Sequence, residues 1–144
     1  MNNIVWKNAD GSISVTYLVE AQNADLHAEE LQFNGDIPAD SEMVAKNIDI
    51  PTDREFRGAW AWITEDPVID IDMDKAVEVT KIRLRQERQP HLAKLDTEYL
   101  KADEDGNTTE KKRIKTEKQR LRDITSLVNN NMSLEEMKGV KVNG

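Results

Sequence analysis

The sequence predicts an α+β fold in which a small β-rich N-terminal module is followed by a C-terminal antiparallel helical hairpin. Apolar residues alternate with polar ones over residues 13–19, and they recur at helical spacing from residue 73 onward. Charge changes between the two regions: residues 1–72 contain 15 acidic and 4 basic side chains, and residues 73–144 contain 13 acidic and 16 basic. We therefore expect three segments. They are an acidic β-rich module over residues 1–71, a charged helical hairpin over 72–128, and a short capped helix and tail over 129–144.

The N-terminal module is predicted to begin with a β-hairpin, because residues 8–11 (NADG) supply turn chemistry between two apolar stretches. Asn23 and Asp25 are alternative caps for a helix that follows. Thr52 and Glu55 have the spacing of a capping box, which predicts a short helix or 3₁₀ turn before Phe56. The expected elements, in chain order, are strands at residues 4–6 and 13–19, a helix at 24–33, and strands at 43–50 and 68–71.

The C-terminal half is predicted to be helical. A first long helix is expected to begin after Asp72, and Pro90 lies within it. Because proline lacks a backbone donor and clashes with the preceding turn, we expect a kink or a break into two helices there. The residues that fall at helical spacing along one face are Met73, Val77, Thr80, Leu84, His91, Leu95 and Tyr99.

A second helix is predicted to return along the first. Residues 102–108 read as a loop, and Asn107 and Glu110 have the spacing of a capping box. The apolar stripe of the second helix is thin, so this helix needs a partner to be stable. The stripe consists of Ile114, Leu121, Ile124 and Val128.

The C-terminal segment is predicted to hold one more short helix. Ser133 and Glu136 form a third capping-box pattern, and Gly139 is expected to end the helix that they open. Residues 140–144 are expected to fray.

Local chemistry predicts a non-enzymatic protein without a catalytic residue or cofactor site. The chain has no cysteine and only two histidines, His27 and His91, and it contains neither a nucleophile motif nor a glycine-rich phosphate loop. Asp70, Asp72 and Asp74 are spaced like the start of a calcium loop. However, lysines stand at positions 75 and 81, where such a loop needs Gly and Glu. We interpret the three carboxylates as a strand end and a helix cap, and we expect no metal site.

A basic helical face permits an alternative function, binding of nucleic acid. Acidic residues are interspersed along this face, no aromatic side chains are interleaved for contact with bases, and the whole chain carries a net charge of −8. We therefore favour a solvated, salt-bridged face and regard nucleic acid as an unlikely partner. The basic residues are Arg83, Arg85, Arg88, Lys111, Lys112, Arg113, Lys115, Lys118, Arg120 and Arg122.

Aromatic residues before position 63 are the candidates for a protein interface. Tryptophan is favoured as an interface anchor, but Trp60 and Trp62 can equally form the core of a small module. We expect one of these two tryptophans to face the other way in an extended segment. If the function is binding, the expected contact residues are Phe56, Trp60 and Trp62, with Arg54 and Arg57 at the rim.

Two stretches resemble segments of small proteins encoded in the tail modules of tailed bacteriophages. The first is IDIPTDREFRGAW at residues 48–60. The second is DMDKA at residues 72–76 and RLRQERQPHLAKLD at residues 83–96, followed by Leu-Arg-Asp at 121–123. The order and spacing of these stretches agree with that family, and the resemblance covers roughly residues 43 to 125.

The resemblance implies a role near the phage tail, as a tail-fibre assembly chaperone or as a small structural adaptor of the virion. The implied partners are tail or tail-fibre proteins, and a homo-oligomer is also possible. No apolar run approaches the roughly 18 residues that span a bilayer, and the first residues do not read as a signal peptide. We therefore expect the host cytoplasm during assembly, or the virion tail, as the location.

Overall fold

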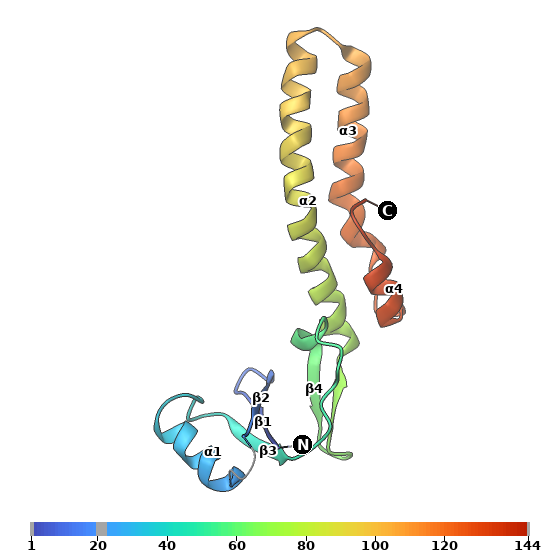
Figure 1. The fold of residues 1–144 in the computed structure, drawn as a ribbon. Helices are drawn as coiled ribbons and strands as arrows, with labels where there is room; N and C mark the ends of the chain where they lie inside the picture. Colours follow the sequence, from blue (N-terminus) through green and yellow to red (C-terminus); the bar gives the residue numbers. More distant parts are fainter. Residues whose placement is uncertain (1, 20–22, 144) are drawn as a thin grey trace. The chain divides into compact units, whose positions relative to one another are not determined.

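The computed structural model describes residues 2–19 and 23–143 of the chain (Figure 1). The chain divides into two compact units, Met1–Asp72 and Met73–Gly144. The fold is mixed α+β, and all strands in the described residues belong to the first unit. This observation confirms the predicted fold class at the level of an α+β chain with a small strand-rich N-terminal region.

A three-stranded antiparallel sheet forms the base of the first unit. Its central strand β1 (Asn3–Lys7) pairs on one side with β2 (Ile13–Tyr17) and on the other with β3 (Glu42–Lys46). The first two strands form the predicted hairpin, and Gly11 takes a φ of +83° in its turn. The strand predicted over 43–50 ends early because Asn47 adopts a φ of +55°, which is incompatible with extended pairing.

Both faces of the central strand are covered by apolar residues. Val5 packs in a cluster with Ile50, Trp60 and Ile69, whereas Ile4 and Trp6 pack with Ala28 of helix α1 (Ala24–Phe33). The Asn23 side chain caps α1, accepting bonds from the backbone N–H groups of the next turn. The predicted helix and the first of its two alternative caps are therefore confirmed.

A two-stranded sheet completes the first unit. Strands β4 (Trp60–Ile63) and β5 (Val68–Ile71) pair antiparallel after a short 3₁₀ turn, η1 (Arg57–Ala59). The predicted capping box at Thr52 is wrong: the backbone N–H of Glu55 donates to the Asp53 carboxylate instead, at 3.1 Å. A carboxylate two residues upstream reaches this N–H by a tight local turn, which replaces a helical cap.

The second unit begins with one long helix, α2 (Met73–Glu104). It continues through Pro90, so the predicted break into two helices is wrong. Buried Leu84 and Leu95 lie on either side of the proline, and their packing holds the helix together across the missing hydrogen bond. The helix also extends into the predicted loop, which is reduced to a turn in which Gly106 has a φ of +65°.

Helix α3 (Thr108–Asp123) follows this turn and lies beside α2 (Figure 1). The Asn107 side chain accepts from the backbone N–H of Glu110 at 3.1 Å, so it caps the helix. The predicted capping box is only half formed, because the Glu110 carboxylate accepts from Arg113 instead of from the Asn107 backbone. All four side chains of the predicted apolar stripe are buried. The helix ends earlier than predicted, at Asp123, so Ile124 lies in the 3₁₀ turn that follows and Val128 lies beyond that turn. Across the two helices, Lys118 pairs with Asp96.

The chain then continues through the 3₁₀ turn η2 (Ile124–Leu127) to helix α4 (Leu134–Gly139). The predicted capping box of Ser133 and Glu136 is confirmed in both directions, by side chain to backbone bonds of 3.1 and 2.8 Å. The prediction that residues 140–144 fray is wrong for the described residues up to 143, because Val142 is buried. Gly144 lies outside the described residues.

Three arginines hold the helix ends of the second unit through backbone carbonyls. Arg83 donates to the carbonyl oxygens of Met137 and Val140, at 3.1 and 2.9 Å. The Arg88 guanidinium donates to the carbonyl oxygens of Leu121 and Arg122, at 3.2 and 2.9 Å. The Arg120 guanidinium donates to the carbonyl oxygen of Val142 at 2.9 Å. Carbonyls at helix ends lack intrahelical partners, so these guanidinium groups satisfy acceptors that the helices leave open.

Replacing Arg83 with alanine should lower the free energy of unfolding of the second unit by about 1–3 kcal/mol, because two carbonyl oxygens lose a charged donor. The measurement is urea unfolding followed by far-ultraviolet circular dichroism. Arg85→Ala is the matched control, since Arg85 is exposed on the same helix. It should change stability by no more than about 0.5 kcal/mol. Equal losses in the two variants would contradict the anchoring role of Arg83.

Candidate protein-interaction sites

The predicted interface residues separate into buried and accessible groups. Phe56 and Trp60 expose only 2% and 3% of their surface, Trp62 is half-buried, and Arg54 and Arg57 are exposed. Trp60 and Trp62 are two positions apart along β4, so both point to the same face of the strand, and the expectation that one of them faces the other way is wrong. Trp60 belongs to the buried cluster, and the partly exposed Trp62 packs against it. In this structure Phe56 and Trp60 are core residues. Their role as contact residues stays a prediction, because a partner could reach them only if they became exposed.

Trp62 lines a pocket of about 440 Å³ in the first unit. The pocket lies against β3, an edge strand, and Lys7 and Glu42 give it both signs of charge. An edge strand offers unpaired backbone groups to another chain. The other lining residues are Met43, Val44, Thr64 and Pro67.

Arg54 lies over an exposed tyrosine of the same unit. Its guanidinium donates to the Tyr17 hydroxyl at 2.7 Å, and its central carbon lies 5.4 Å from the centre of the tyrosine ring. Tyr17 is 49% exposed. The pair is therefore an accessible aromatic and cationic surface, of the kind that is enriched at protein interfaces.

Alanine substitution should separate the roles of the two tryptophans. Trp60→Ala should lower the free energy of unfolding by about 3–5 kcal/mol, because a buried aromatic side chain leaves a cavity. Trp62→Ala should cost less than half as much, since its side chain is partly in solvent. Urea unfolding followed by intrinsic fluorescence measures both, because the remaining tryptophans all lie in the first unit. Comparable losses for the two variants would show that Trp62 is a core residue.

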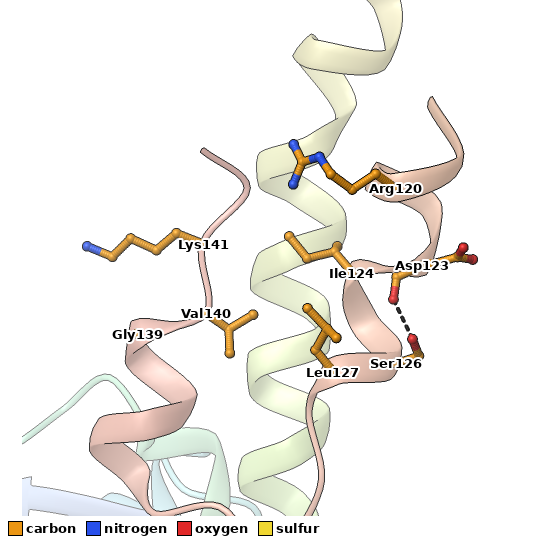
Figure 2. A pocket seen from close by; sticks show the side chains of 8 residues that line it. All are labelled: Arg120, Asp123, Ile124, Ser126, Leu127, Gly139, Val140 and Lys141. Carbon is orange, nitrogen blue, oxygen red and sulfur yellow. Dashed lines mark hydrogen bonds between the residues drawn. The ribbon is translucent and has the colours of Figure 1, made fainter. Parts of the chain in front are cut away.

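A pocket of about 460 Å³ lies in the second unit (Figure 2). Figure 2 shows the side chains of Ile124 and Leu127, from η2, directed toward that of Val140, whereas the Lys141 side chain extends away from them. Leu127 is 62% exposed although it lies among apolar side chains. Arg120, Asp123, Ser126, Gly139 and Lys141 complete the lining.

The walls of this apolar pocket are fixed by hydrogen bonds. The Ser126 hydroxyl donates to the Asp123 carbonyl oxygen at 2.5 Å, as the dashed line in Figure 2 marks. Arg120 ties α3 to the C-terminal segment through Val142. Sequence reasoning missed this pocket. The available signal was Leu127, an apolar residue that falls outside the buried stripe of its helix.

A basic pocket of about 410 Å³ lies on the surface shared by α2 and α3. Tyr99 comes from α2, and the ammonium nitrogens of Lys111, Lys115 and Lys118 of α3 lie 5.6, 5.8 and 5.9 Å from the centre of its ring. Such distances allow cation–π attraction. The expectation that no aromatic side chain is interleaved with the basic residues is therefore wrong, because Tyr99 lies among them. The pocket is lined by Tyr99, Lys115, Lys118, Gln119 and Arg122.

Ion pairs shift the pKa values of several groups along α3. The hydrogen bond from Lys111 lowers the pKa of the Asp103 carboxyl, and that from Arg120 lowers the pKa of Glu117. Arg113 lowers the pKa of Glu110 in the same way. These carboxylates are therefore charged and paired at neutral pH, as expected of a salt-bridged face.

Clusters of metal-ligating side chains and membrane-spanning helices are not found in the part of the chain that the structure describes. No three histidine, aspartate or glutamate side chains in residues 2–19 and 23–143 are grouped to hold a metal ion. None of the described helices combines the length and the apolar character needed to cross a membrane.

Comparison of the chain with protein-family models, with curated proteins and with solved structures finds no match.

Proposed function

We propose that this chain is a bacteriophage tail-associated protein that acts by binding other proteins, without catalysing a reaction. It serves as a tail-fibre assembly chaperone or as a small structural adaptor of the virion tail. The observation that carries the binding role is the apolar pocket around Leu127. The phage context rests on the resemblance of residues 48–60 and 83–96 to tail-module proteins.

The apolar pocket suits a side chain of a partner protein. Its volume falls within the range of small-ligand sites, which is about 300–1,000 Å³. An exposed leucine beside two other aliphatic side chains gives the surface an apolar centre, and burial of such a centre against a partner is favourable. The partner segment in this proposal therefore carries a large apolar side chain.

Charge indicates what surrounds that side chain in the partner. Helix α3 carries seven basic and three acidic side chains, a net charge of +4. Electrostatic complementarity across an interface raises the association rate and selects among partners. An apolar side chain within an acidic segment of a tail or fibre protein is the occupant that fits this end of the second unit.

In this proposal α2 and α3 act as an antiparallel helical hairpin that presents the pocket at one end. Two salt bridges join the C-terminal part of α2 to the N-terminal part of α3. Arg113 pairs with Glu98 at 3.4 Å, and Lys111 pairs with Asp103 at 2.5 Å. A paired arm of this kind loses little conformational freedom when a partner binds, so it binds more tightly than a flexible segment.

The proposal is tested by binding of this chain to each tail and fibre protein of the phage that encodes it, measured by biolayer interferometry. Leu127→Asp should raise the Kd of the partner complex by about thirtyfold or more, as for a typical hot-spot residue. Leu100→Asp is the matched control: Leu100 is 64% exposed but does not line the pocket. It should change the Kd by less than about threefold.

Circular dichroism should show that both aspartate variants are folded. Equal weakening by both would mean that leucine exposure in general, and not the pocket, controls binding. Failure of every tail and fibre protein to bind the unmodified chain would contradict the proposed function.

A further inference from the structure

Two cations at the basic pocket have side chains that form no ion pair with any described residue. They are Lys115 and Arg122, and both are exposed. By contrast, Lys118 pairs with Asp96, and Lys111, beside the pocket, pairs with Asp103. The pocket therefore holds unsatisfied positive charge within a cluster whose other members are already neutralised.

The aromatic side chain distinguishes this pocket from an ordinary basic surface. Tyr99 is half-buried, and it comes from a different helix than the cations around it. Its phenol adds a neutral donor to the ammonium and guanidinium groups. Gln119 is positioned by bonds of 2.9 and 3.0 Å to the Asp123 carboxylate.

This set of donors matches a phosphate group better than a carboxylate. A phosphate monoester carries a charge of about −1.5 to −2 and three acceptor oxygens. A single carboxylate offers one charge and two oxygens, so it would leave most of the convergent donors without a partner. Arginine is particularly suited to phosphate because its planar fork donates two parallel bonds.

We propose that the pocket formed by Tyr99, Lys115, Lys118, Gln119 and Arg122 binds a phosphate group. This site is separate from the apolar pocket and does not depend on a tail partner. The phosphate can belong to a small phosphate compound or to the backbone of a single-stranded nucleic acid, in which case a base can stack on Tyr99.

Isothermal titration of the full chain at low salt, with pyrophosphate and with a short single-stranded oligonucleotide, tests the proposal. Arg122→Ala and Lys115→Ala should each weaken binding of at least one probe by about tenfold, since each removes a charge-assisted contact. Lys112→Ala is the matched control, because Lys112 is an exposed lysine of α3 that does not line the pocket. It should weaken binding by less than about threefold.

The two probes distinguish the source of the phosphate. Oligonucleotide binding that Tyr99→Leu weakens would support a nucleic-acid backbone with base stacking. Pyrophosphate binding by a chain that does not bind the oligonucleotide would support a small phosphate compound. Absence of binding of either probe would overturn the proposal. So would equal losses in Lys112→Ala and Arg122→Ala, because diffuse attraction by the helix would then account for the binding. A glutamate hexapeptide that binds at the pocket when neither phosphate probe does would also overturn it.

Discussion

The guanidinium groups of Arg83, Arg88 and Arg120 determine how the C-terminal part of the second unit is held. Each donates to backbone carbonyl oxygens near the end of a helix or in the C-terminal segment. Charged donors make stronger bonds than neutral ones, and carbonyls at helix ends have no other intrahelical partner. The bonds of Arg83 and Arg120 add to the burial of Met137 and Val142 in holding the segment that carries Val140, which forms one wall of the apolar pocket.

Several arginines of the basic helical face are engaged in contacts within the second unit. Arg83 and Arg88 are turned toward backbone acceptors, and Arg113 and Arg120 pair with neighbouring glutamates. Lys115 and Arg122, which form no ion pair with a described residue, both line the pocket beside Tyr99. A face on which acidic residues are interspersed in the sequence is therefore partly neutralised by ion pairs, and two of its unpaired cations lie at one pocket.

Elements whose signals are local could be predicted from the sequence. The alternation in residues 13–19 located β2, the Asn23 cap located the start of α1, and the Ser133 capping box located α4. Each of these depends on side chains within a few residues of one another. The stripe from Ile114 to Val128 was also visible, because helical periodicity depends only on spacing.

Features that depend on tertiary contacts could not be predicted. The helix passes through Pro90 because residues on both sides of it are packed, and β3 ends at Asn47 because the backbone turns there. The candidate sites show the same limit. Tyr99 and Lys115 are 16 positions apart in sequence and meet only because α2 lies beside α3. The burial of Trp60 and the partial exposure of Trp62 also required the position of β4 to be known.

The central claim, that this chain works within the phage tail by binding tail proteins, is tested most directly by quantitative mass spectrometry of two samples. They are purified mature particles and tail complexes isolated from infected cells. The account predicts peptides of this chain at a fixed ratio to a tail or fibre protein in at least one sample. Presence in particles would identify an adaptor, and presence only in the intracellular complexes would identify an assembly factor. Absence of the chain from both samples would contradict the account.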